Sequence, residues 1–144
     1  MKINIKKLNE KAIIPTKGSD FAAGYDLYAC EDNSILIEPH ETVKIKTGLA
    51  IQPPAGYFGA IFARSGLATR FGLRPANCCG ICDQDYTGEY IVALHNDTEE
   101  PQTINPKDRI AQLIFLPYID VKFCEVDELD DTQRGDGGFG STGK

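Results

Sequence analysis

The chain is built from short stretches of alternating polar and apolar residues, and this pattern restricts it to a β fold. The clearest stretch is Thr42–Ile51, where alternate residues would share one face: Val43, Ile45, Thr47, Leu49 and Ile51. A period of two over that length is typical of a half-buried strand. Similar stretches recur about every 8–12 residues, the spacing of sandwiches, jelly rolls and barrels: Lys2–Lys6, Ile35–Glu38, Tyr57–Ala63, Tyr90–His95, Arg109–Leu116 and Val121–Val126.

Helical periodicity is nearly absent. Only Ser65–Gly72 could form a helix, and Gly66 and Gly72 would limit it to a turn or two. We therefore predict one all-β domain over residues 1–126, a distorted barrel or a jelly-roll-like subunit. Residues 127–144 are acidic and then glycine-rich, and cannot bury enough apolar surface to order themselves. This segment is either a disordered terminus or a flexible arm that orders when a ligand binds.

Charge and cysteine content exclude several classes of protein. The formal net charge of −6 disfavours a nucleic-acid binder, whose affinity would come largely from Lys and Arg. The sequence has no run of 18 apolar residues, the length needed to span a membrane as a helix. Met1–Ile5 lacks the apolar core of a signal peptide. Five cysteines without a secretion signal indicate reduced thiols in a cytoplasmic protein. We expect Cys78, Cys79 and Cys82 to be small buried thiols in a strand rather than metal ligands.

Two segments combine polar groups in ways that suit a ligand. Arg64, Ser65 and Gly66 follow a predicted strand and open the short helix, where free amides, a hydroxyl and a guanidinium could hold an anion. Cys79–Tyr90 is typical of a hairpin, in which Asp83 is either a turn residue or a catalytic base, and Tyr86 could pack on a ligand ring. If pairing is regular, Asp83 and Asp85 share a face and Gln84 points to the other.

Two predicted strands each carry one polar residue among apolar neighbours. Asp26 lies within Ala23–Ala29 and Gln112 within Arg109–Phe115, so each is either a buried structural group or part of a site. In the tail, glycine amides, hydroxyls and Arg134 suit a phosphate. Phe139 would gain little there unless it stacked on a flat base.

Five segments, taken in order, resemble the five sequence motifs of the homotrimeric deoxyuridine triphosphatases (dUTPases). They are AGYDL at 23–27, RSGLA at 64–68, GICDQDYTGE at 80–89, RIAQL at 109–113 and RGDGGFGSTG at 134–143. Each motif alone is weak, but five in the family's order are specific. The resemblance implies a β-barrel or jelly-roll-like subunit, a homotrimer, active sites shared between chains, and Mg²⁺-dependent hydrolysis of dUTP to dUMP and pyrophosphate.

The resemblance also implies a role for each matching residue. Asp83 would be the general base that directs water at the α-phosphorus, and Gln112 would help to place the water or the phosphate. Asp26 would hold waters of an Mg²⁺ ion that the triphosphate binds, from a neighbouring chain. The remaining substrate-binding residues would be Arg64, Ser65, Gly66, Asn77, Ile81, Cys82, Tyr86, Ile91, Arg134, Phe139, Gly140, Ser141 and Thr142.

Recognition of the nucleotide would fall to the hairpin. Asn77 and the amides around Ile81 and Cys82 would match the edge of uracil, and Tyr86 under the deoxyribose would leave no room for a 2′-hydroxyl. Two alternatives stay open: a dCTP deaminase of the same fold, and a non-catalytic module that binds nucleotide and regulates a partner. Asp83 favours catalysis, since binding alone does not need it.

Overall fold

A computed structural model describes residues 1–138 of the chain. It is built from strands, with one short helix. In order they are β1 (Asn4–Lys7), β2 (Thr16–Lys17), β3 (Tyr25–Tyr28), β4 (Ile35–Ile37), β5 (Thr42–Gln52), β6 (Tyr57–Phe62), α1 (Ser65–Phe71), β7 (Leu73–Pro75), β8 (Cys79–Cys82), β9 (Glu89–Asn96), β10 (Gln102–Ile104) and β11 (Arg109–Pro117). The predicted all-β fold is confirmed. The described strands form three sheets rather than one continuous barrel, which is the jelly-roll-like form.

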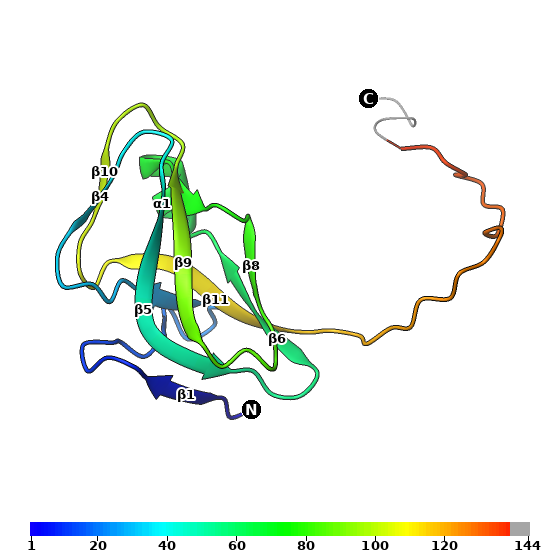
Figure 1. The fold of residues 1–144 in the computed structure, drawn as a ribbon, viewed down its shortest axis with the longest axis horizontal. Coiled ribbons are helices and arrows are strands. Elements are labelled where there is room, and N and C mark those ends of the chain that lie inside the picture. Colours follow the sequence, from blue (N-terminus) through cyan, green and yellow to red (C-terminus); the bar gives the residue numbers. More distant parts are fainter. Residues whose placement is uncertain (139–144) are drawn as a thin grey trace.

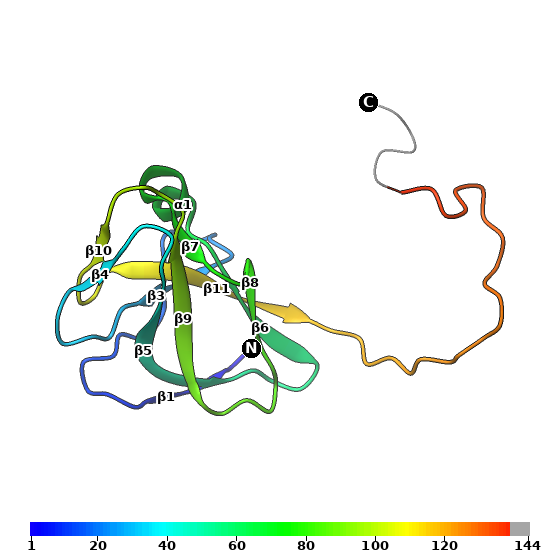
Figure 2. The same cartoon turned by 45° about the horizontal axis from the view of Figure 1, so that its top comes forward.

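Antiparallel pairing organises these sheets. One has the order β1-β5-β9-β7, another β2-β3-β11-β6-β8, and β10 pairs with β4. The two large sheets pack face to face around an apolar core that includes Leu27, Ile45, Leu94 and Leu113, all 1% exposed or less. Figures 1 and 2 show β9 and β11 crossing on opposite sides of this core. Because most strands that pair in the sheets are far apart in the chain, long-range burial of apolar faces holds the fold together.

The long strand β5 follows the predicted alternation but contains one irregularity. Its pairing with β9 shifts register between Lys46 and Ala50. Gly48 lies there with a φ of +68°, and a Cβ at this position would approach the Ala12 Cβ and the Cys30 Sγ to 2.8 Å. Glycine is therefore required at this bulge for both conformation and space.

The helix α1 is as short as expected. Arg64 precedes it with extended backbone, and Gly72 ends it in the left-handed region, where its N–H bonds to the carbonyl of Ala68. This termination matches the αL C-cap that favours glycine. The short helix thus follows β6 directly and places Arg64 at the end of that strand.

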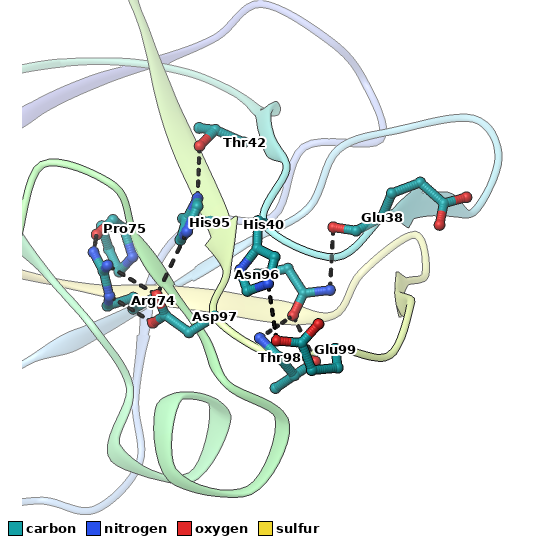
Figure 3. A network of polar contacts seen from close by, with 10 residues as sticks. All are labelled: Glu38, His40, Thr42, Arg74, Pro75, His95, Asn96, Asp97, Thr98 and Glu99. Atoms are coloured by element: carbon teal, nitrogen blue, oxygen red, sulfur yellow. Dashed lines mark hydrogen bonds and ion pairs between the residues drawn. The ribbon is translucent and has the colours of Figure 1, made fainter.

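A polar network surrounds the buried side chain of Asn96 at the end of β9 (Figure 3). Asn96 is fully buried, and its Nδ2 donates to the carbonyls of Ile37, Glu38 and Glu100 while its Oδ1 accepts from the Thr98 N–H. Every polar atom of this amide is therefore paired, as burial demands. The network ties the end of β9 to the loops beside β4 and β10.

The prediction of a strand at Val121–Val126 is wrong for this structure. The last strand ends at Pro117, and residues 118–138 run away from the sheets (Figures 1 and 2). Phe123 is 98% exposed. The stretch alternates like a strand, but a strand needs a hydrogen-bonded neighbour, and the described part of this chain supplies none.

Candidate active site

Five of the predicted site residues meet in one hollow at an end of the five-stranded sheet. The cross-strand partners of Gln112 are Asp26 on β3 and Phe62 on β6, so β11 brings Gln112 between the other two strands. Arg64 follows β6 and completes the group. The hollow has a volume of about 320 Å³, and its lining includes Asp26, Arg64, Ser65, Gly66, Arg109 and Gln112.

An ion pair orients Arg64 within this hollow. Its Nε donates to Asp26 Oδ1 at 2.8 Å, and Arg109 Nη1 lies 3.3 Å from Asp26 Oδ2. Asp26 is only 9% exposed, whereas the side chain of Arg64 remains 26% exposed. One buried carboxylate therefore holds two guanidinium groups, which leaves the hollow cationic overall.

Gln112 is held just as firmly. Its Nε2 donates to the carbonyl of Ala63 at 2.8 Å, next to Arg64 in the chain. Its Oε1 occupies the space above Gly24, where a Cβ would come within 2.5 Å. From the sequence, Asp26 and Gln112 could each be a structural group or part of a site. Both descriptions apply, because each side chain makes a structural bond and also lines the cationic hollow.

The acidic residues of the hairpin line a second hollow. This space of about 590 Å³ is lined by Phe58, Ile81, Asp83, Gln84, Asp85 and Tyr118. The strand β8 ends at Cys82, so regular alternation stops before Asp83, and Gln84 lines the same hollow as both aspartates. The expectation that Gln84 points to the other face is therefore wrong. Gln84 Oε1 accepts from the Gly56 N–H and the Tyr118 hydroxyl, each at 3.1 Å.

Tyr86 is bonded within the hairpin and faces solvent. This ring is 45% exposed, and its hydroxyl donates to the Glu89 carbonyl at 2.8 Å. Ile81 and Ile91 are exposed as well, and the Asn77 amide lies over Gly80, 3.5 Å from where a Cβ would be. Side chains that a folded domain would ordinarily bury are thus presented to solvent around the hairpin.

The cysteines of the hairpin differ from one another. Cys82 is buried in β8, as expected, and Cys79 on the same strand is half-buried. Cys78 is exposed and precedes the strand with a φ of +55°. The prediction of three buried thiols is wrong for Cys78. Burial raises the pKa of the Cys82 thiol to about 11, which keeps it protonated at neutral pH and supports a packing role.

Both hollows open on the same face of one sheet. In an antiparallel sheet, directly opposed residues lie on the same face. Ala60 opposes Ile81 and Ile114, and Phe62 opposes Gln112, so an apolar strip runs between the cationic hollow and the acidic one. One chain therefore keeps the predicted phosphate-binding residues apart from the predicted base.

Of the predicted tail residues the structure describes only Arg134, which lines neither hollow. Arg134 is exposed, and its Nε donates to the Gly137 carbonyl within the tail itself. Phe139, Gly140, Ser141 and Thr142 lie outside the described residues. Two residues that the sequence reasoning missed are Arg109 and Tyr118. Strand register brings Arg109 to Asp26, and a backbone bond from the Tyr118 N–H to the Gly56 carbonyl holds Tyr118 beside Gln84.

The fold and the two hollows define a small all-β protein that presents a cationic and an acidic site on one sheet face. Residues 10–143 match the family model for dUTPase. The chain is 47% identical to the deoxyuridine 5′-triphosphate nucleotidohydrolase of Desulfitobacterium hafniense (strain DSM 10664 / DCB-2), over 99% of this chain and 95% of the relative. It is 46% identical to that of Nautilia profundicola, over the whole of both chains. The chain belongs to the dUTPase family.

Solved structures agree with this assignment. A Staphylococcus bacteriophage 80alpha dUTPase (G164S mutant) with dUpNHpp superposes with a TM-score of 0.91 at 26% identity, covering 99% of each chain. Among residues 1–138, no helix is long and apolar enough to cross a membrane.

Proposed function

We propose that this chain hydrolyses dUTP to dUMP and pyrophosphate in the cytoplasm, which limits uracil in DNA and supplies dUMP for thymidylate synthesis. Membership of the dUTPase family supports the reaction. The structural observation that carries the proposal is the pairing of a cationic hollow with an acidic one on a single sheet face. The cationic hollow can bind the anionic triphosphate, and a carboxylate of the acidic hollow can act as the base for a water nucleophile.

In this proposal Asp83 is the general base. Its carboxylate is exposed in the acidic hollow, where it can accept a proton from a water that attacks the α-phosphorus of dUTP. Such assistance accelerates reactions by about 10²–10⁴-fold. Gln112 uses one N–H on Ala63 and offers its second to the water or to an α-phosphate oxygen. Positioning and charge neutralisation supply the rest of the acceleration.

The phosphate chain is proposed to lie in the cationic hollow. Arg64, aimed by Asp26, binds phosphate oxygens together with the hydroxyl of Ser65 and the amides of Ser65 and Gly66. The arm of residues 127–144 is proposed to close over the nucleotide, with Phe139 on the uracil. The γ-phosphate would then be bound by Arg134, Gly140, Ser141 and Thr142.

Mg²⁺ is proposed to be bound mainly by the triphosphate. No three His, Cys, Asp or Glu side chains of residues 1–138 converge to hold a metal, which suits an ion brought in with its substrate. Asp26 is the carboxylate that fits. The two arginines engage one lone pair on each of its oxygens, and a carboxylate has about four, so it can still accept from a metal-bound water. The ion would neutralise charge on the phosphates.

The hairpin is proposed to recognise the nucleoside. Asn77 and the backbone beside Ile81 and Cys82 would pair with the edge of uracil, and cytosine would leave groups unpaired at about 1–3 kcal/mol each. Tyr86 would support the deoxyribose and exclude a 2′-hydroxyl, and Ile91 would line the same space. The exposure of these side chains in one chain supports this proposal.

A homotrimer with shared sites is proposed because the hollows are separate in one chain. The strip between them exposes apolar surface on the sheet. Ile81 is exposed, and four further apolar side chains of the strip are half-buried: Phe58, Phe62, Ile114 and Leu116. Contact between copies would cover this strip and bring the acidic hollow of one copy to the cationic hollow of another.

The reaction is tested by incubating the protein with dUTP, dCTP, dTTP or UTP, with Mg²⁺ or EDTA, and measuring pyrophosphate and ammonia. We expect pyrophosphate from dUTP alone, and less of it with EDTA. Asp83→Asn should lower kcat by about 10²–10⁴-fold while dUTP still binds, and Asp85→Asn is the matched control. Ammonia from dCTP would indicate a deaminase, and binding without turnover a regulatory module.

Site sharing is tested by mixing two inactive variants. Asp83→Asn removes the proposed base and Arg64→Ala removes a proposed phosphate ligand. If the two residues act on one substrate from different chains, unfolding and refolding the variants together forms hybrid oligomers with some intact sites. Activity should reappear in the mixture but not in either variant refolded alone. A mixture that stays inactive although hybrids form would contradict shared sites.

A further inference from the structure

A buried tyrosine lies behind the exposed ring of the hairpin. Tyr90 on β9 is 1% exposed, whereas Tyr86 is 45% exposed. Their ring centroids are 6.1 Å apart, and the ring planes differ by 27°. This is the offset arrangement that aromatic pairs prefer. The inner ring belongs to the rigid core, and the outer ring faces solvent, so the pair connects the core to the hairpin surface.

Other contacts of Tyr86 lie at its hydroxyl end. The hydroxyl donates to the Glu89 carbonyl, and Gly88 lies so close that a Cβ there would come within 2.6 Å of the Tyr86 hydroxyl. Glu89 is itself anchored, because its Oε1 accepts from the Gly48 N–H at 2.8 Å. These contacts hold one edge of the ring, and Tyr90 is what supports it from behind.

Packing alone does not account for a tyrosine at position 90. Among the described residues its hydroxyl is the one buried side-chain oxygen or nitrogen without a hydrogen-bond partner of good geometry, and it lies beside the Cys82 thiol. A buried hydroxyl in this state lowers stability. Gly59 leaves room for it, since a Cβ at Gly59 would lie 3.1 Å from this oxygen. The unpaired hydroxyl therefore does not explain the tyrosine, and the contact that remains is the stacking of its ring on Tyr86.

We propose that Tyr90 is a positioning residue whose ring sets the height and tilt of Tyr86, and thereby helps the enzyme to reject nucleotides with a 2′-hydroxyl. The inference rests on the proposed function, in which Tyr86 supports the deoxyribose. A small displacement of Tyr86 away from the sugar would open the space that a ribose needs. Tyr90 touches no substrate and acts through Tyr86 alone.

The test compares four proteins: the wild type, Tyr90→Phe, Tyr90→Met and Leu94→Ala. Phenylalanine keeps the ring and removes the unpaired hydroxyl, and methionine fills the volume without a flat face. Leu94 is a fully buried residue further along the same strand, so its variant measures the effect of a weakened core. For each, kcat and KM are measured with dUTP and with UTP, together with the melting temperature. Tyr90→Leu replaces the methionine variant if the latter does not fold.

Tyr90→Phe should keep the wild-type preference for dUTP and melt at the same or a higher temperature. Tyr90→Met should raise the KM for dUTP and lower the dUTP-to-UTP ratio of kcat/KM by about 3- to 10-fold, the range of one aromatic pair. Leu94→Ala should melt earlier with the ratio unchanged. An unchanged ratio in Tyr90→Met, or an equal change in Leu94→Ala, overturns the inference. If the wild type releases no pyrophosphate from dUTP, the proposed function falls, and this inference with it.

Discussion

The Gln112 side chain occupies the space that a side chain at position 24 would need. A Cβ on Gly24 would lie 2.5 Å from Gln112 Oε1, and Gln112 is at the same time bonded to the Ala63 carbonyl at 2.8 Å. The Gln112 amide therefore holds the chain at Ala63, next to Arg64, and it leaves no space for a side chain at position 24, just before β3.

Gly24→Ala should lower activity without unfolding the domain. The added methyl would displace Gln112 from Ala63, and misplacement of a catalytic group by about 1 Å can cost about 10²-fold in rate. The measurement is kcat with dUTP beside a melting curve. Gly18→Ala is the matched control in the lining of the same hollow, because a Cβ there meets nothing within 4 Å and leaves Gln112 in place. Full activity in Gly24→Ala would show that the position of Gln112 is not critical.

Asp26→Asn should lower both activity and stability. The substitution leaves the Arg64 guanidinium, which is mostly buried, without its charged partner, and we expect a loss of about 1–2 kcal/mol in the free energy of unfolding. The KM for dUTP should rise, because Arg64 is then free to move. Denaturant unfolding and steady-state kinetics measure the two effects.

The control for this variant is Asp32→Asn, which breaks the Lys11–Asp32 pair at the surface. Both partners are largely exposed, at 66% and 74%, so solvent screens their attraction. We expect neither stability nor KM to change. Equal effects of the two substitutions would mean that the Asp26 pair acts only as another surface charge.

The stability of the protein should fall as the pH rises from 9 to 11, in part because of Cys82. Burial raises its pKa from an ordinary value of 9.0 to about 11, so over this range the unfolded chain loses a proton that the folded chain keeps. The buried thiol thus contributes fully below pH 9, and about 2–3 kcal/mol is lost by pH 11. Burial raises the pKa of Tyr90 in the same direction.

Cys82→Val tests this contribution, since valine has a similar volume and does not titrate. The free energy of unfolding of this variant, measured at several pH values, should fall less steeply above pH 9 than that of the wild type. Cys124→Val, at an exposed position, should leave the slope unchanged. Parallel curves for all three proteins would contradict a buried, titrating Cys82.

Cys78→Gly should stabilise the protein. Cys78 has a φ of +55°, and the Cys79 N–H bonds to the Asn77 carbonyl across it, so the chain makes a tight turn there. A side chain in this left-handed region costs about 1–2 kcal/mol that glycine avoids, and the greater freedom of glycine in the unfolded chain offsets part of this gain. A rise in melting temperature is expected. Cys124→Gly, in the exposed tail, should produce no such rise.

Much of the fold could be predicted from local pattern. The alternation in Thr42–Ile51 predicts β5, and the glycines at 66 and 72 predict a helix as short as α1. Side-chain period and backbone freedom depend on residues next to one another, so the sequence carries them directly. The same argument explains the failure at Val121–Val126, where the local pattern is present and no described neighbour completes a strand.

The candidate site divides in the same way. The residue types in each motif, and the order of the motifs, are local properties of the chain and point to the family. The folded arrangement is needed to show that Asp26 orients Arg64, that Gln112 bonds to Ala63, that Tyr90 packs against Tyr86, and that Asp83 lies apart from the cationic hollow in one chain. These relationships depend on strand register and on packing between residues distant in the chain, and such long-range geometry follows from burial of the whole sheet rather than from any local pattern.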